Sequence, residues 1–310
     1  MAEDNIDEIV KQMSLREKAM LLVGCESLVS KDSLTVYVPG AAGYTKSFPQ
    51  YGIPSTVMAD GPVGVRIFPI KVDGKRHYCT CFPSSTLLAS TWDTQLVETQ
   101  AGAMGKEAAV YDVDVILTPG INIMRNPLCG RNFEYFSEDP VLSGLMGAAM
   151  VNGVQSRGIG TSLKHFVANN QQVNKLNNDS RIPVKALREI YLKGFEIAVK
   201  EGNPVSIMTS YNLINGIHAA NSKDLCMTVA RKEWGFDGAI MSDWNTTVPE
   251  DGSVPWKCVA AGNDIIMPGN PDDDKNIRQA YKEGKLTEEE IRNCAGHLVS
   301  MIRRLESTDC

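Results

Sequence analysis

The chain has 310 residues, of which 43% are hydrophobic and 22% are charged, a composition typical of a folded domain with a large core rather than a disordered chain. The net charge of −6 argues against a nucleic-acid partner, and we interpret the basic run KVDGKRH (Lys71 to His77) as a solvated loop. Because the first residues, MAEDNIDEIV, are acidic and lack the apolar segment of an export signal or membrane anchor, we expect a cytoplasmic protein with no membrane partner.

Hydrophobic periodicity and capping signals predict alternating helices and strands. Ser14 with Glu17, and Thr287 with Glu290, form capping boxes that begin the second helix and the last one. The predicted helices are Asn5 to Met13, Ser14 towards Gly24, Asp93 to Tyr111, Leu142 to Gln155, Val184 to Lys200, Ser222 to Trp234 and Thr287 to Leu305. The predicted strands are Thr56 to Ala59, Val113 to Leu117, Thr161 to Leu163, Val205 to Met208, Ala239 to Met241, Asp264 to Met267 and a short or irregular one within Phe82 to Leu88.

This alternation is typical of a parallel sheet covered by helices. The strand candidates are more numerous than a crevice-type nucleotide fold needs, so we predict one α/β domain over residues 1–310, a barrel of the (β/α)₈ type. No GxGxxG follows a strand and no GxxxxGK[ST] occurs, so the sequence lacks the phosphate-binding loops of dinucleotide and nucleoside-triphosphate enzymes.

The cysteines give no sign of a metal centre. The chain has eight, irregularly spaced, and Cys79 and Cys81 are the only close pair. A CxC pair with no second pair and no nearby histidine cluster is a poor zinc site. We therefore expect reduced thiols, no bound metal and no cofactor.

Polar, chemically able residues follow almost every predicted strand. Asp243 lies just past the end of the apolar strand Ala239 to Met241, and alone it is explained equally well as a helix cap or an ion-pair partner. In a parallel barrel, however, the carboxyl ends of all strands meet at one mouth. The residues at these ends are Asp60; Thr118, Pro119 and Gly120; Lys164 and His165; Ser210, Tyr211 and Asn212; and Ser242, Asp243 and Trp244. Together they can bind vicinal hydroxyl groups, and the indole offers an apolar face to a sugar ring.

The segment from Pro119 to Pro140 is too polar for a core and too aromatic for a plain linker. Arg125 and Arg131 are its strongest candidates to reach a ligand, and its two Glu and one Asp can hold their guanidinium groups. A rigid surface loop laced by ion pairs explains the segment equally well.

Five strings resemble motifs of glycoside hydrolase family three, which contains many β-glucosidases. They fall in the family's order and span nearly the whole chain. The strings are ADGPVGVR (Ala59 to Arg66), NPLCGRNFEYFSEDP (Asn126 to Pro140), KHFVANNQ (Lys164 to Gln171), SYNLINGIHAANS (Ser210 to Ser222) and GFDGAIMSDW (Gly235 to Trp244).

The resemblance implies a (β/α)₈-type barrel, irregular in its early strands, that hydrolyses a small β-glycoside or oligosaccharide with retention by double displacement. Under it Asp243 is the nucleophile, and seven further residues surround the sugar. These are Asp60, Arg131, Lys164 and His165 on its hydroxyls, Tyr211 beside the nucleophile, Trp244 as an aromatic wall on the leaving-group side, and Arg66 near the same mouth.

Two departures from the family pattern affect the chemistry. Many members have Glu and Arg where this chain has Gln172 and Lys175, so one hydroxyl contact changes. In most of the family a separate α/β sandwich domain after the barrel supplies the general acid/base glutamate, and this sequence ends at Cys310. The His/Asp pair that β-N-acetylglucosaminidases carry after KHF is also missing from VANNQQVN. The resemblance therefore implies that a second domain or a partner chain donates the acid/base.

Two other functions remain open at this stage. The first is a sugar-binding or regulatory barrel that keeps the pocket without turnover, for which an unpaired Asp243 beside a tyrosine is unnecessary. The second is Schiff-base chemistry at Lys164, which requires an apolar pocket that lowers the lysine pKa. The neighbouring His165 and the polar strand ends argue against it.

Overall fold

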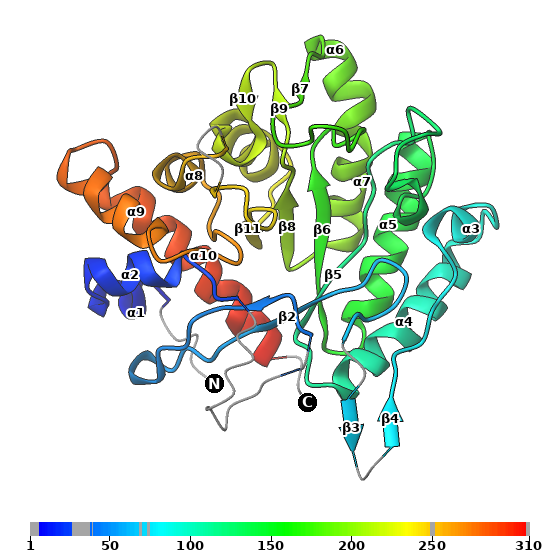
Figure 1. Ribbon diagram of the computed structural model, residues 1–310, viewed down its shortest axis with the longest axis horizontal. Coiled ribbons are helices and arrows are strands. Elements are labelled where there is room, and N and C mark those ends of the chain that lie inside the picture. Colours follow the sequence, from blue (N-terminus) through cyan, green and yellow to red (C-terminus); the bar gives the residue numbers. More distant parts are fainter. Residues whose placement is uncertain are drawn as a thin grey trace.

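A six-stranded sheet in the order β1-β2-β5-β6-β8-β11 forms the centre of the fold (Figure 1). The computed structural model describes residues 6–26, 38, 40–67, 70–72, 75–248 and 252–307. The strands are β1 (Gly43–Tyr44), β2 (Val57–Asp60), β5 (Val115–Leu117), β6 (Gly160–Phe166), β8 (Ser206–Thr209) and β11 (Ala239–Met241). All neighbours pair in parallel except β1 and β2, which are antiparallel.

Isolated bridges continue the sheet beyond both edges and close it into a barrel. They join Met241 of β11 to Ile265, Ile266 to Val23, and Cys25 to Tyr44 of β1. The Ser242 N–H donates to the carbonyl of Ile265 at 2.9 Å, and the Gly24 N–H donates to the carbonyl of Ile266 at 2.9 Å. The predicted α/β barrel with irregular early strands is confirmed. Its irregular strands are β1 and the two segments that pair only through isolated bridges.

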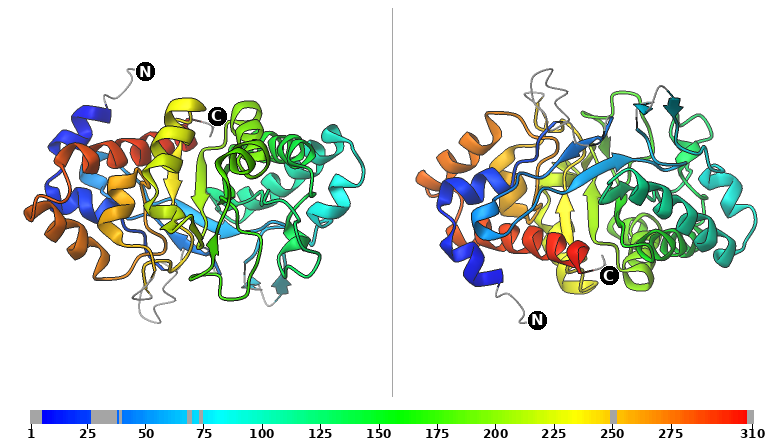
Figure 2. Two further views of the ribbon diagram at one scale, coloured as in Figure 1. Left: turned by 90° about the horizontal axis from the view of Figure 1, so that it is seen from above. Right: turned by 90° about the horizontal axis from the view of Figure 1, so that it is seen from below.

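Helices cover both sides of these strands (Figures 1 and 2). On one side lie α3 (Ser85–Ala89), α4 (Thr94–Val110), α5 (Pro140–Gln155), α6 (Val184–Ala186) and α7 (Lys193–Gly202). On the other lie α1 (Ile6–Gln12), α2 (Leu15–Leu21), α8 (Pro255–Ala261), α9 (Asp273–Lys282) and α10 (Glu288–Glu306). The α4 and α5 backbones approach so closely that a Cβ on Gly153 would lie 2.3 Å from the carbonyl oxygen of Glu98.

The capping signals fix the helix starts as predicted. Both capping boxes form: Ser14 accepts a hydrogen bond from the N–H of Glu17, and Thr287 accepts one from Glu290. The Asp93 carboxylate caps α4. The face of α10 that the sequence predicts to be apolar is buried at Ile291, Cys294, Leu298 and Met301.

Three local predictions were wrong. Phe82 to Leu88 contributes to α3 rather than a strand, because Ser84 caps it through the Leu87 N–H and Leu88 and Ala89 are buried together. Asp264 to Met267 forms only isolated bridges, since it pairs at single residues on either side. The basic run Lys71 to His77 is not a plain loop, because β3 (Ile70–Val72) and β4 (Lys75–His77) pair antiparallel.

Two further features were not anticipated. Residues Leu187–Tyr191 and Asp224–Glu233, predicted as α-helix, adopt π-helical turns. A small sheet of β7 (Asp179–Ser180), β9 (Leu213–Ile214) and β10 (Ile217–His218) lies beyond the ends of β6 and β8 (Figure 1).

Candidate active site

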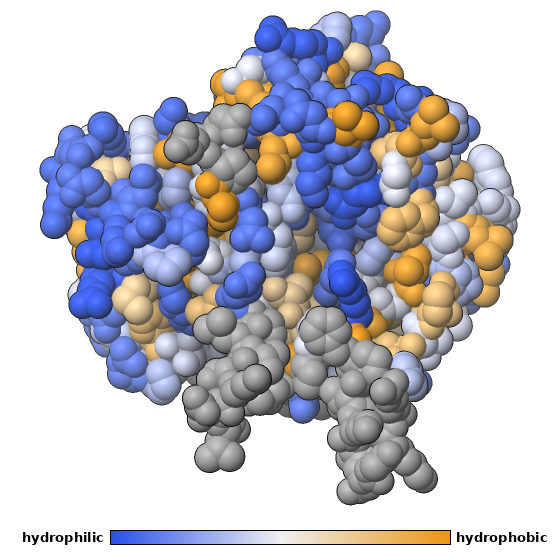
Figure 3. Space-filling view, viewed as in Figure 1, coloured by the Kyte–Doolittle hydropathy of each residue, from blue (hydrophilic) through white to orange (hydrophobic). Residues whose placement is uncertain are grey.

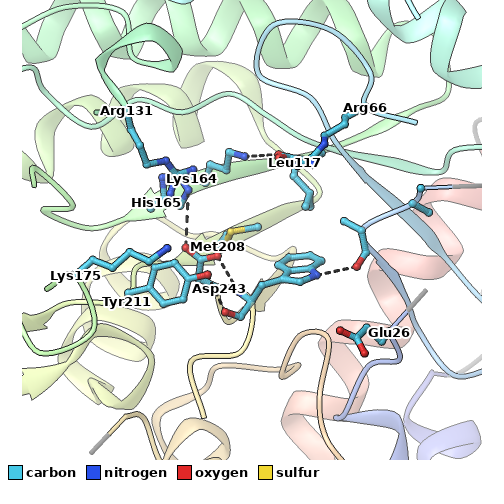
Figure 4. A pocket seen from close by; sticks show the side chains of 15 residues that line it. Glu26, Arg66, Leu117, Arg131, Lys164, His165, Lys175, Met208, Tyr211 and Asp243 are labelled. Atoms are coloured by element: carbon cyan, nitrogen blue, oxygen red, sulfur yellow. Dashed lines mark hydrogen bonds and ion pairs between the residues drawn. The ribbon is translucent and has the colours of Figure 1, made fainter. Parts of the chain in front are cut away.

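A cavity of about 560 Å³ lies at the carboxyl ends of the barrel strands (Figure 4). Its size falls in the range of small-molecule sites. All eight site residues that the family resemblance implies line this cavity: Asp60, Arg66, Arg131, Lys164, His165, Tyr211, Asp243 and Trp244. Figure 3 shows hydrophilic side chains gathered beyond the ends of β6 and β9, in the middle of the face. The barrel therefore brings together predicted site residues that lie up to 184 positions apart in the sequence, from Asp60 to Trp244.

A buried ion pair holds β11, the strand that leads to Asp243, in place. Asp264 Oδ2 accepts hydrogen bonds from the Ile240 N–H at 2.6 Å and from Arg231 Nη2 at 2.6 Å. Arg231 also donates to the carbonyls of Phe236, at 2.9 Å, and of Gly238. Because β11 is fully buried, this network fixes the position of the strand and the direction in which the chain continues from the strand to Asp243. Sequence reasoning missed the pair, since Arg231 and Asp264 are 33 residues apart.

The two carboxylate oxygens of Asp243 have different environments. Oδ1 accepts the Trp244 N–H at 2.7 Å. Oδ2 is buried and has no hydrogen-bond partner among the described residues, and the nearest cationic or imidazole nitrogen recorded is His165 Nε2 at 3.9 Å. Burial raises the Asp243 pKa, and Arg131, the Trp244 N–H and Lys164 oppose this rise. One oxygen is thus held by a backbone N–H, while the other is buried at the cavity wall without a hydrogen bond among the described residues.

Lys164 lies between two carboxylates. Its Nζ is 2.8 Å from Asp60 Oδ1 and 3.7 Å from Glu134 Oε2, and Glu134 also pairs with the Nε of Arg131. Burial acts to raise the Asp60 pKa, but Lys164 and then Arg131 outweigh it, so this pKa is lowered. Asp60 is therefore an ionised hydrogen-bond acceptor at neutral pH. Schiff-base chemistry needs a lysine in apolar surroundings, whereas the Lys164 side chain lies between two carboxylates, which argues against that chemistry.

His165 is a neutral hydrogen-bonding group. Its ring is buried, with Nδ1 3.2 Å from the Tyr135 hydroxyl, and its backbone N–H donates to Asn122 Oδ1 at 2.9 Å. Burial, and then the charges of Arg131 and Lys164, hold the His165 pKa well below its usual range. An uncharged imidazole can bind a ligand hydroxyl without neutralising Asp243.

Tyr211 and Lys175 form the wall beside Asp243 (Figure 4). The Tyr211 hydroxyl donates to the Trp244 carbonyl at 2.7 Å, and Lys175 Nζ lies 4.0 Å from the centre of the Tyr211 ring. Burial lowers the Lys175 pKa, while Asp243 opposes this. On the next wall the Trp244 indole N–H donates to the Ala42 carbonyl at 2.8 Å. Sequence reasoning identified Lys175 only as a departure from a family pattern and not as a lining residue.

The remaining candidates separate clearly. Arg66 lies at the rim, with its side chain 73% exposed and its Nη1 3.9 Å from Asp60 Oδ2. Arg125 does not line the cavity and donates instead to the Tyr191 hydroxyl at 3.3 Å. Of the three acidic residues in its segment, only Glu134 holds a guanidinium group, because Asp139 caps α5 and Glu138 accepts from Ser137. The lining residues Glu26, Leu117 and Met208 were not anticipated, since nothing in their local sequence marks them.

The described residues form no metal site, no disulfide and no membrane-spanning helix. Among the described residues no group of three or more His, Cys, Asp or Glu side chains is placed to hold a metal ion. The cysteines in the described ranges are all free thiols. Within the same ranges no helix has both the length and the apolar character needed to cross a membrane.

The fold and the cavity together define a barrel protein with a cavity at its mouth that acidic, basic and aromatic side chains line. The chain belongs to glycosyl hydrolase family 3: the model of the family's N-terminal domain matches residues 51–301.

Similar proteins include several glycosidases. The chain is 40% identical over 300 residues to an exo-alpha-(1->6)-L-arabinopyranosidase of Bifidobacterium longum and 39% identical over 307 residues to thermostable beta-glucosidase B of Acetivibrio thermocellus. These matches cover 95% and 97% of this chain but 37% and 38% of the relatives. The structure of beta-glucosidase 3B from Thermotoga neapolitana in complex with glucose superposes with a TM-score of 0.91 at 45% identity, over 98% of this chain and 43% of that one. The chain thus spans about two fifths of the length of these proteins.

Proposed function

We propose that residues 1–310 form the barrel domain of a retaining β-glycosidase that acts on β-glucosides, with Asp243 as its nucleophile. The observation that carries the proposal is the buried Oδ2 of Asp243, which has no hydrogen-bond partner among the described residues and belongs to a residue that lines the cavity. Family membership and the names of the relatives support this activity. A binding module without turnover has no use for a carboxylate oxygen that is buried without a hydrogen bond, which costs stability.

In the first step, Asp243 Oδ2 attacks the anomeric carbon, and the bond from that carbon to the leaving-group oxygen breaks. The Trp244 N–H on Oδ1 aims the carboxylate. Arg131 and Lys164 oppose the rise in the Asp243 pKa that burial causes, and so favour the ionised form that a nucleophile requires. The departing oxygen takes up a proton, and water later cleaves the glycosyl ester with help from the same acid/base group.

The sugar hydroxyls are bound at the end of the cavity away from Trp244. Asp60 is the acceptor there, Lys164 and Arg131 are donors, and neutral His165 binds as either. The fork of Arg131 is braced by Glu134, so its free N–H groups keep one direction. Trp244 forms the wall on the leaving-group side.

The acid/base comes from a second domain or a partner chain in this proposal. A retaining pair of carboxyls must lie about 5 to 5.5 Å apart. Asp60 and Glu134 do not qualify, because each is held by Lys164, and Asp60 is ionised by its lowered pKa. A domain outside this sequence is consistent with the greater length of the relatives.

A burst experiment tests the proposal. A dinitrophenolate leaves without a proton, so the chain should release about one phenolate per molecule from 2,4-dinitrophenyl β-glucoside and then stall for want of a base. Azide, a nucleophile that needs no base, should restore turnover. The corresponding α-L-arabinopyranoside belongs in the panel, because one relative carries that specificity in its name. Release of no phenolate from any matched glycoside would leave a sugar-binding barrel as the better account.

The cytoplasmic location expected from the sequence stays a prediction, which fractionation of the source cells with an antibody against the chain would check.

A further inference from the structure

A second hollow of about 430 Å³ adjoins the sugar cavity. The two share Asp60 and Arg66 as a common wall. The hollow is formed by the loop 61–67, by residues 78–81 and by Phe133. The chemistry proposed above makes no use of it. Because one of the two shared residues, Asp60, is proposed to bind a hydroxyl of the sugar, a group that enters the hollow past Asp60 is a substituent of the bound sugar and not its leaving group.

Two half-exposed aromatic rings flank the hollow. Tyr78 is 60% exposed and Phe133 is 50% exposed, and they come from segments 55 residues apart in the chain. Aromatic side chains bury large areas when a partner is available, and pairs of rings prefer edge-to-face or offset contacts with another ring. An aromatic group bound in the hollow would cover exposed surface of both rings.

Contacts within the protein hold the backbone around the hollow in place without a ligand. Gly64, at φ +128°, passes so close to the neighbouring segment that a Cβ would lie 2.2 Å from the Thr80 carbonyl oxygen. The Phe82 N–H donates to the Val63 carbonyl at 2.8 Å, and the Thr80 N–H donates to the Glu107 carboxylate at 2.9 Å. A preformed wall lowers the entropy cost of binding.

The charges around the hollow favour a neutral occupant. Arg66 faces Asp60 at 3.9 Å, and Asp60 is also paired with Lys164, so the shared wall is a compensated cluster. Burial, and then Glu107, raises the Cys79 pKa to about 11, so this thiol is uncharged at neutral pH. An anionic ring would meet Asp60, and a cationic one would meet Arg66.

We infer that this hollow is a subsite for a neutral aromatic group carried by the sugar, as in an aryl ester or aryl ether of one of its hydroxyls. This deepens the proposed function and rests on it for the sugar part alone. The substrates it favours are glycosides acylated or etherified on the sugar that is cleaved.

The test compares methyl β-glucoside with its monobenzoates by ligand-detected NMR titration. At least one positional isomer should bind about tenfold more tightly than the parent, the gain expected for roughly 1.4 kcal/mol of added aromatic contact. Phe133→Ala, and independently Tyr78→Ala, should remove this gain and leave the parent's affinity unchanged. Leu128→Ala, an exposed residue of the same segment as Phe133 that does not line the hollow, should keep it.

The subsite is disproved if no isomer gains affinity or if the gain survives both aromatic substitutions. Benzyl alcohol alone is titrated in parallel, because it reports on the hollow without any sugar. If methyl β-glucoside fails to bind, the proposed function fails, and benzyl alcohol decides the subsite separately. Saturation transfer from the protein to benzyl alcohol that is lost in Phe133→Ala but kept in Leu128→Ala supports the subsite. No transfer from the unsubstituted protein to benzyl alcohol rejects the subsite.

Discussion

Replacing Lys164 with Met should destabilise the fold by about 3 kcal/mol at pH 7. The ammonium nitrogen lies 2.8 Å from Asp60, a gross attraction of about 6 kcal/mol at an effective dielectric constant near 20, and 3.7 Å from Glu134. Desolvation offsets much of this, and losing one partner of a buried pair typically costs about 3 to 5 kcal/mol. The lower figure applies because the Asp60 side chain is 37% exposed and water screens it.

The loss should depend on pH in a defined direction. The folded-state pKa of Asp60 is lowered, so its contribution is present above the unfolded value of about 3.9 and disappears as pH falls through the folded value. In the Lys164→Met variant the Asp60 carboxylate loses the charge that lowers its pKa most and therefore protonates more readily. The difference in unfolding free energy between the two proteins should therefore be largest at pH 7 and clearly smaller at pH 4.

Urea denaturation followed by circular dichroism at both pH values measures this difference. Lys18→Met is the matched control: Lys18 is also buried, but its partner Glu288, at 3.2 Å, is mostly exposed and can be hydrated when left alone. That control should lose less than about 1 kcal/mol. A Lys164→Met loss no greater than the control's, or one equal at pH 7 and pH 4, would refute the reasoning.

Two further substitutions are informative. Asp243→Asn should raise the unfolding free energy at pH 7 by about 1 kcal/mol, because burial raises the Asp243 pKa and the charge of Asp243 therefore costs stability above pH 4. Thermal unfolding should show that this gain in stability vanishes near pH 3. A loss of stability at pH 7 would contradict the prediction. Arg131→Lys should weaken glucose binding about tenfold in calorimetry through loss of one arm of the fork, whereas Arg125→Lys, outside the cavity, should not. Equal affinities for both variants would remove Arg131 from the site.

The parts of the site that the sequence predicted share a local signature. A short apolar run ends in a polar residue, as Ala239–Met241 ends before Asp243, and barrel geometry then brings such ends to one mouth. The same reasoning placed Asp60, Lys164 and Tyr211 on the wall of one cavity. Their chemical roles stay predictions.

The parts that it missed depend on contacts between distant segments. Composition could not separate Arg125 from Arg131, because the difference arises only when the loop turns at Asn132–Glu134 and carries Glu134 beneath Lys164. Asp264 was assigned to a strand, yet its carboxylate anchors β11 through Arg231. Neither pairing leaves a periodic trace in the sequence.

Mass spectrometry of a trapped intermediate tests the central claim most directly. Incubation with 2,4-dinitrophenyl 2-deoxy-2-fluoro-β-glucoside, which slows both steps but keeps an activated leaving group, should add one fluoroglucosyl unit to the peptide that contains Asp243, and Asp243→Asn should gain none. An adduct on another carboxylate of the cavity, such as Glu26, or the same adduct in the Asn variant, would contradict the assignment of Asp243 as the nucleophile.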